Sequence, residues 1–223
     1  MEMNRRTNRR LLVHLGCGPD VQPTEWIDCD GSWNVLTAKL PAPIRTVIVR
    51  AGQFRSWPQH VRFLNLRKPF PFDDNSVDAI YASHVWEHLT RSDAEKATLE
   101  AFRVLRRGAV LRVAVPDLHF FCESYVGSHN ENAAEILMEQ LHLRDRGGKK
   151  SLLRKLYTGM TDFHSHKWMY DARSLSNLLR SVGFSGVRER MCFDSDIPEI
   201  RQVEHTGRVS KGLGIAVEGI KPL

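Results

Sequence analysis

The chain has 223 residues, enough for one sizeable domain with a buried core. Its 42% hydrophobic and 26% charged residues are typical of globular proteins, and no apolar run approaches the roughly 18–20 residues of a membrane span. The net charge of +6 would suit an anionic partner, although solvated surface charge explains it equally well.

The N-terminus and the cysteines indicate the compartment. Residues 1–10, "MEMNRRTNRR", predict a basic flexible tail, and the apolar stretch behind it breaks at Gly16, which argues against a signal peptide. The four cysteines lack C-x-x-C spacing, so we expect free thiols in a reducing cytoplasm rather than disulfides or a zinc site.

From residue 11 to about 118, apolar runs alternate with helical patterns, which indicates a parallel α/β sheet. The helix before the fifth strand is predicted to open with a capping box of Ser92 and Glu95 and to end at Gly108. Residues 33–60 contain three prolines and predict helix and loop. The expected strands are "RLLVHLG", "EWIDCDG", "VRFLNL", "VDAIYAS" and "AVLRVAVP".

Residues 119–165 interrupt this alternation and predict a helical insertion, serving as a lid or substrate element. A helix in "ENAAEILMEQLHL" leads to the basic, Gly-Gly-containing "RDRGGKKSLLRKL", for which a solvated helix pair is an equal alternative. Asp171 should cap the next helix and Gly183 should end it, before strands in "SGVRERM" and "GLGIAVEGI". Residues 11–223 are thus expected to form a single domain.

The stretch "LLVHLGCGPD" places Gly16 and Gly18 directly after the first strand. Without a Cβ, such a turn allows the backbone to approach a ligand closely. The dinucleotide fingerprint requires a third glycine, but position 21 is Val21. The loop is therefore of a nucleotide-binding type without the spacing for a pyrophosphate.

Four pieces in this order resemble the class I S-adenosylmethionine-dependent methyltransferases, most closely the small type 11-like members. They are "HLGCG", "WIDCDGS", "RKPFPFDDNSVDAIYASHVWEHL" and "AFRVLRRGAVLRVAVPDL". The resemblance implies a Rossmann-like, seven-stranded, mostly parallel sheet with helices on both faces and the helical insertion after the fifth strand. It also implies S-adenosylmethionine as cofactor, a nucleoside without phosphate that has no need of the third glycine.

The resemblance also assigns the donor site. An acid ending the second strand can bond both ribose hydroxyls, and we choose Asp30, with Asp28 on the same strand face left open. Asn65 stands where relatives commonly carry an acid near the adenine, and its amide oxygen can still accept that N–H. The expected donor residues are His14, Gly16, Cys17, Gly18, Asp30, Gly31, Asn65, Leu66, Ser83 and His84.

A base near the methyl acceptor would accelerate transfer to a hydroxyl. His84 follows the fourth strand at the edge where ligands bind in open α/β sheets. His164 and His166 share one side of an extended "DFHSHKWMYD", and Asp117 could orient any of these histidines. We expect acid–base or substrate-binding roles and no metal ion, because H-x-H alone is weak evidence for one. His88 is expected to be structural. Trp168 is expected to pack in the core, with stacking on a substrate ring as the alternative.

The acceptor class is narrowed by an absent motif. Nitrogen methyltransferases of nucleic acids and proteins typically carry an acid or Asn before Pro-Pro and an aromatic residue, where this chain has "YASHVW". We therefore expect a small-molecule acceptor. The resemblance to the type 11-like members implies a sugar or glycoconjugate hydroxyl, and the basic segment would suit a phosphorylated or nucleotide-linked sugar. The alternatives are an RNA methyltransferase and a non-catalytic module that binds S-adenosylmethionine.

Overall fold

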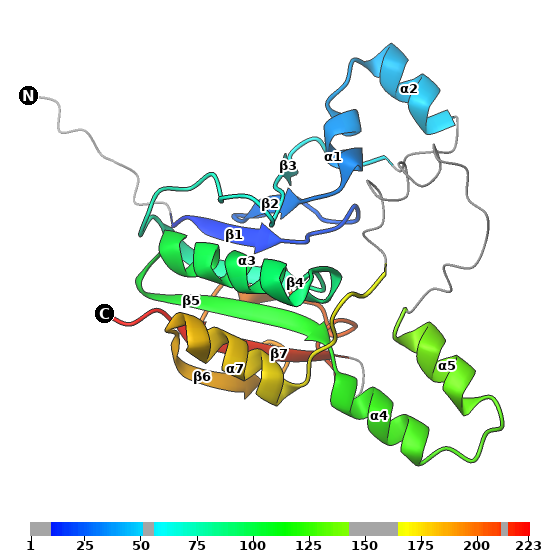
Figure 1. Cartoon of the computed structure of the whole chain (residues 1–223). Coiled ribbons are helices and arrows are strands. Elements are labelled where there is room, and N and C mark those ends of the chain that lie inside the picture. The colour runs from blue at the N-terminus through cyan, green and yellow to red at the C-terminus, as the bar shows by residue number, and fades with distance from the viewer. Residues whose placement is uncertain (1–9, 51–55, 143–164, 211–213) are drawn as a thin grey trace, which may run out of the picture.

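The computed structural model describes residues 10–50, 56–142, 165–210 and 214–223. Seven strands form one sheet in the order β3-β2-β1-β4-β5-β7-β6, with β7 antiparallel to both of its neighbours and the other pairs parallel (Figure 1). This confirms the predicted mostly parallel, Rossmann-like α/β sheet. The strands are β1 Leu12–Leu15, β2 Ile27–Asp30, β3 Arg62–Phe63, β4 Val77–Ser83, β5 Leu105–Pro116, β6 Ser185–Arg190 and β7 Gly214–Ile220.

The strand order reverses between β1 and β4. From β1 the chain builds outward through β2 to β3, whereas β4 pairs with the other side of β1 and leads on to β5. In an open α/β sheet, the crevice at the carboxyl ends of two such strands is where ligands bind. This position lies between Leu15, at the end of β1, and Ser83, at the end of β4.

Helices α3 (Arg91–Val104) and α7 (Ala172–Val182) lie side by side over one face of the sheet (Figure 1). The small residues Ala97 and Ala101 allow α3 close to the strands, while Leu175 and Leu179 of α7 are fully buried. As predicted, Asp171 caps α7: its Oδ1 accepts from the Ser174 amide at 2.7 Å, and Gly183 ends the helix at φ +113°.

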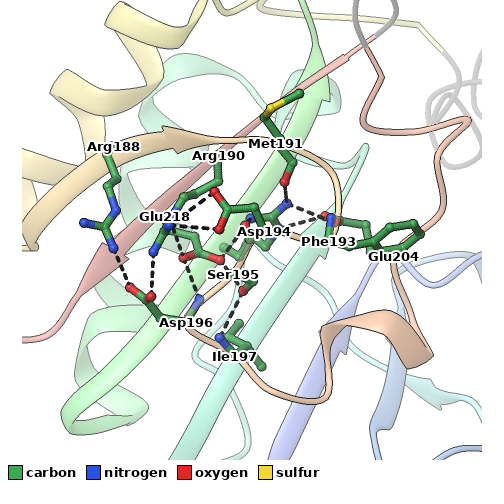
Figure 2. Close-up of polar contacts among 11 residues, drawn as sticks. Arg188, Arg190, Met191, Phe193, Asp194, Ser195, Asp196, Ile197, Glu204 and Glu218 are labelled. Carbon is green, nitrogen blue, oxygen red and sulfur yellow. Dashed lines mark hydrogen bonds and ion pairs between the residues drawn. The ribbon is translucent and has the colours of Figure 1, made fainter.

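The opposite face of the sheet is covered by residues 191–210, whose one described helical turn is the 3-10 helix η2 (Ile200–Gln202). This segment is fastened to β5 by Arg112, which is completely buried. The guanidinium donates five hydrogen bonds: two to Glu204 (2.7 and 2.9 Å), one to Glu218 (2.9 Å), and one each to the Met191 and Asp194 carbonyls. Figure 2 shows this network. All five N–H donors of the arginine are thereby satisfied.

Several local boundaries differ from those predicted. Thr90 caps α3, its hydroxyl accepting from the Asp93 amide, so the predicted Ser92–Glu95 capping box is wrong. The helix ends at Val104, and Gly108 lies within β5 at φ +78°, so it is not the helix stop. Strand β4 has the predicted bounds, whereas β3 is only two residues long.

Further helices lie outside the two faces of the sheet. Residues 33–60 contain α1 (Trp33–Ala38) and α2 (Ala42–Arg50), in agreement with the predicted helix and loop. The insertion begins beyond the carboxyl end of β5 with α4 (Leu118–Val126) and α5 (Ala133–Gln140) (Figure 1). Its basic Gly-Gly segment and His164 lie outside the described residues. None of the helices in the described part of the chain is long and apolar enough to cross a membrane.

Glu204→Ala should destabilise the protein strongly, because it leaves a buried guanidinium without its two-pronged partner. We expect a loss of about 3–5 kcal/mol in the free energy of unfolding, measured by urea denaturation. Glu199→Ala on the same segment is the matched control: Glu199 pairs with Arg10, whose side chain is 42% exposed, and its loss should cost under about 1 kcal/mol. Equal losses in the two variants would contradict the importance of the buried network.

Candidate functional site

The turn after β1 is built by two glycines with left-handed backbones, at φ +72° for Gly16 and +73° for Gly18. The Gly16 amide donates to the Cys29 carbonyl at 2.9 Å, which holds the turn against β2. A Cβ at Gly16 would lie 2.9 Å from the Ser83 carbonyl oxygen, so this turn touches the end of β4. A Cβ at Gly18 would meet no atom of the described residues within 4 Å. Gly16 therefore serves the packing of the turn, and Gly18 faces open space.

The two aspartates of β2 have different surroundings. Asp30, at the end of the strand, accepts from the Gly18 amide at 3.3 Å and from the Ser32 amide at 2.8 Å. Asp28, within the strand, is buried, with Oδ1 at 3.0 Å from His14 Nδ1 and Oδ2 at 3.3 Å from His60 Nε2. Asp30 is thus the aspartate that joins the glycine turn.

The other residues predicted for donor binding lie in different surroundings. Gly31 stands between Asp30 and the cap of α1, while Asn65 is exposed and its Oδ1 accepts from the Arg67 amide. Leu66 belongs to the core cluster under α3, and His14 is buried with its ring stacked on Tyr81. The structure therefore places the His14 side chain against the face of the sheet rather than at the turn. Burial raises the pKa of Cys17 far above its ordinary value, which leaves a neutral thiol.

His84, directly after β4, faces a buried carboxyl group. It has a left-handed backbone at φ +48°, which is uncommon for a residue with a side chain. Its Nε2 donates to the Arg208 carbonyl at 2.9 Å, and Nδ1 lies 3.5 Å from Glu87 Oε1. Burial lowers the pKa of His84 to about 4 and raises the pKa of Glu87 to about 8. At pH 7 the imidazole is therefore neutral and the carboxyl group is mostly protonated.

The segment that leads into α7 binds back onto this turn. The Lys167 and Trp168 amides donate to the Glu87 carbonyl at 2.7 and 3.2 Å. This contact brings His166 to His88, with ring centroids 5.1 Å apart, and the His142 ring lies 4.9 Å from that of His166. Burial, followed by the neighbouring His88 and His142, lowers the pKa of His166 to about 4. Polar groups from three distant parts of the chain thus share one edge of the sheet.

Of the residues predicted for the acceptor side, His84 and His166 lie in this cluster. Asp117 caps α4, its Oδ1 accepting from the His119 amide at 3.0 Å, so its side chain is used within the insertion. His164 lies outside the described residues. The prediction that Trp168 packs in the core is wrong, because it is 42% exposed.

Two members of the cluster were not predicted as functional from the sequence. Glu87 was not singled out, and His88 was expected to be structural. Both belong to the short 3-10 helix η1 (Trp86–His88), in which Glu87 is 1% exposed. A carboxyl group and two histidines within "SHVWEH" are a signal in the sequence, but nothing local shows that the carboxyl group is buried.

The geometry of the glycine turn fits the methyl donor predicted from the sequence. Gly18 leaves open space at the reversal of strand order, and the Asp30 carboxylate lies beside it with oxygens suited to ribose hydroxyls. The S-adenosylmethionine molecule contains no phosphate, and the turn has no third glycine to hold one.

Comparison with known proteins gives a family for much of this region. Residues 13–113 match the model of a family described as "Methyltransferase domain". The comparison with curated proteins gives no match.

Similar solved structures include two methyltransferases at low identity. One is a SAM-dependent methyltransferase from Archaeoglobus fulgidus, with 14% identity over 96% of this chain and 87% of that chain, at a TM-score of 0.48. The other is a possible histamine N-methyltransferase from Thermotoga maritima, with 19% identity over 95% and 81% of the two chains, at a TM-score of 0.48.

The family match covers the glycine turn, Asp30 and the turn that carries His84 and Glu87. It also covers the reversal of strand order between β1 and β4, where the donor is expected. Residues 13–113 thus match a methyltransferase domain, in agreement with the predicted resemblance to the class I S-adenosylmethionine-dependent methyltransferases.

Proposed function

We propose that the chain transfers the methyl group to a hydroxyl of a small molecule, of the class of sugars and glycoconjugate precursors. The observation that carries this proposal is the meeting of two parts at one point of the sheet. The glycine turn abuts Ser83, and the histidine–glutamate cluster begins at the next residue, His84. A donor on the turn would therefore face an acceptor held by polar, half-buried groups.

On the donor side, we assign the cradle to Gly16, Cys17 and Gly18, the ribose to Asp30, and the adenine edge to Asn65. When bound, S-adenosylmethionine supplies an electrophilic methyl group on a sulfonium. The turn contributes close backbone approach, and Asp30 contributes two oxygens that already order the Gly18 and Ser32 amides. Preordered groups of this kind reduce the entropic cost of aligning the two reactants.

On the acceptor side, we assign His84 and His166 to contact the reacting hydroxyl. A hydroxyl loses its proton when it takes a methyl group, and we assign His84 to receive that proton. Because Nε2–H donates to the Arg208 carbonyl, the lone pair of the neutral ring lies on Nδ1. The carbonyl also fixes the orientation of the ring, as hydrogen-bonded partners do for other catalytic histidines.

Trp168 supports a sugar as the acceptor. The residue is 42% exposed and lies two positions after His166, and the Arg91 guanidinium carbon lies 5.6 Å from the centroid of its ring. An exposed indole offers a flat apolar surface to the C–H face of a sugar ring. The adjacent arginine suits a phosphate on a nucleotide-linked or phosphorylated sugar. Helices α4 and α5 leave the same edge of the sheet (Figure 1), and we include them on the acceptor side.

Gly18→Val should abolish binding of S-adenosylhomocysteine, because its side chain would fill the open space at the turn. Gly108→Val is the matched control: its backbone is equally left-handed (φ +78° against +73°), but it lies outside the site, at the other end of β5. Calorimetry should show normal binding in the control and none in Gly18→Val, with both folded by circular dichroism. Normal binding by Gly18→Val would contradict the role of the turn.

The acceptor class is tested with radiolabelled S-adenosylmethionine and fractionated cell extract. We expect the label in a low-molecular-weight, sugar-containing fraction, attached through an ether bond. His84→Ala should lower this transfer by about 10²-fold or more and leave the affinity for S-adenosylhomocysteine near that of the parent protein. Label in RNA or protein, or full transfer by His84→Ala, would contradict the proposal.

Trp168→Ala should raise the KM for the identified acceptor by about tenfold, since stacking on an exposed indole is worth roughly 1–1.5 kcal/mol. The kcat and the donor affinity should change little, because the indole touches neither the reacting atoms nor the glycine turn in this assignment. Trp168→Phe keeps an aromatic face, so its KM for the acceptor should lie between those of the parent protein and Trp168→Ala. Steady-state kinetics measure the KM of the parent protein and both variants. An unchanged KM in Trp168→Ala would contradict stacking of the acceptor on Trp168.

A further inference from the structure

Three potential metal ligands meet within the acceptor cluster. Glu87 and His88 are neighbours on η1, and His166 is brought to them by the chain that leads into α7. Each of the three offers one ligand atom, and these atoms all lie within 4.8 Å of one another. The set comprises two imidazole nitrogens and one carboxylate oxygen, a donor set that proteins use for divalent transition metals.

The Glu87 carboxylate and the His166 Nδ1 have no hydrogen-bond partner among the described residues. Both Glu87 carboxylate oxygens are buried and accept no hydrogen bond from the described residues, and the side chain is 1% exposed. The nearest described imidazole nitrogen of His84 is Nδ1, which carries the lone pair and lies 3.5 Å from Glu87 Oε1. The His166 Nδ1 is likewise buried without a hydrogen-bond partner among the described residues. Buried polar atoms are nearly always paired, so a pair of unsatisfied groups side by side indicates a missing ligand.

The surroundings of these residues resemble those of metal ligands. His88 Nδ1 lies 3.2 Å from the Ser165 carbonyl oxygen, which can only accept, so Nδ1 carries the proton and Nε2 the lone pair. A backbone carbonyl on the far nitrogen is the usual way in which a metal-binding histidine is oriented. The Glu87 carbonyl, held by the Lys167 and Trp168 amides, fixes the two segments to each other.

We propose that Glu87, His88 and His166 bind one divalent transition-metal ion of the zinc type. Ligands at about 2.0–2.2 Å from a tetrahedral ion lie about 3.3–3.6 Å apart, so small side-chain rotations would close the present spacing. Three protein ligands leave the fourth position open, as in catalytic rather than structural zinc sites. The sequence led us to expect no metal, because the H-x-H of His164 and His166 is weak evidence for one.

The position of the ion gives it a role in methyl transfer. The glycine turn contacts the chain at Ser83 and Val85, directly before η1, so the ion would lie close to the donor turn. A hydroxyl or carboxylate oxygen of the acceptor would be the natural fourth ligand, and the ion would hold it and favour its deprotonation. This role rests on the proposed function, whereas binding of the ion does not.

The site is tested by titrating the chelator-treated full chain with Zn²⁺, and with Co²⁺ for its visible absorption. We expect one ion per chain and the spectrum of a four-coordinate Co²⁺ centre with nitrogen and oxygen ligands. Glu87→Gln, which keeps the shape of the side chain, and His166→Ala should each weaken binding at least about tenfold. His119→Ala is the control, because this exposed histidine pairs with Glu123 on α4 and should leave binding unchanged.

The outcomes separate the ion from its role. The absence of stoichiometric binding, or full binding by both Glu87→Gln and His166→Ala, would overturn the site. One ion bound in the parent chain and lost in the two variants would establish it whatever the acceptor is. If the metal-free enzyme then methylates the identified acceptor at the full rate, the assigned role in transfer is overturned while the proposed function stands.

Discussion

The buried guanidinium of Arg112 is the interaction on which the arrangement of this enzyme depends. A charge at the centre of a sheet is tolerated only when it is paired and fully hydrogen-bonded, and Arg112 obtains this from Glu204, Glu218 and two carbonyls. These partners require residues 191–210 to lie across β5 and β7 (Figure 2). The same segment contains Arg208, whose carbonyl accepts a hydrogen bond from His84. The ion pairs of Arg112 on one face of the sheet therefore help to orient the His84 ring at the edge of the sheet.

The cluster of His84, Glu87 and His166 at that edge contains a strained backbone and few charged side chains. His84 has a left-handed backbone that costs on the order of 1–3 kcal/mol for a residue with a side chain, and it is held there by β4, by Arg208 and by the turn beyond it. Burial raises the pKa of Glu87 to about 8 and lowers that of His166 to about 4. At neutral pH these two side chains are therefore mostly uncharged.

The placement of the donor and acceptor regions follows from topology. Parallel strands present their carboxyl ends at one edge, and the reversal of order between β1 and β4 separates the connections that leave them. The glycine turn and η1 therefore approach from opposite sides of one crevice, and the contact between Gly16 and Ser83 joins them. The docking of Lys167 and Trp168 on the Glu87 carbonyl then brings a third segment, more than 75 residues away, to the same place.

The sequence by itself determined the elements whose signals are local. The bounds of β4, the Asp171 cap and Gly183 stop of α7, and the glycine turn follow from hydrophobic periodicity and from backbone preferences within a few residues. Even there, Thr90 rather than Ser92 caps α3, because several residues near a helix start can serve and the packing of the helix selects one. The order of the motifs was sufficient for the resemblance to methyltransferases, and residues 13–113 match a methyltransferase family model.

Only the tertiary structure decided which side chains meet. Asp28 and Asp30 share a strand face, and their roles separate because Asp28 is enclosed by His14 and His60 while Asp30 reaches the glycine turn. Glu87, His88 and His166 form a cluster because backbone hydrogen bonds join segments distant in sequence, and Trp168 is exposed because that docking turns it outward. Burial and long-range contact depend on the whole fold, and no local pattern of residue types encodes them.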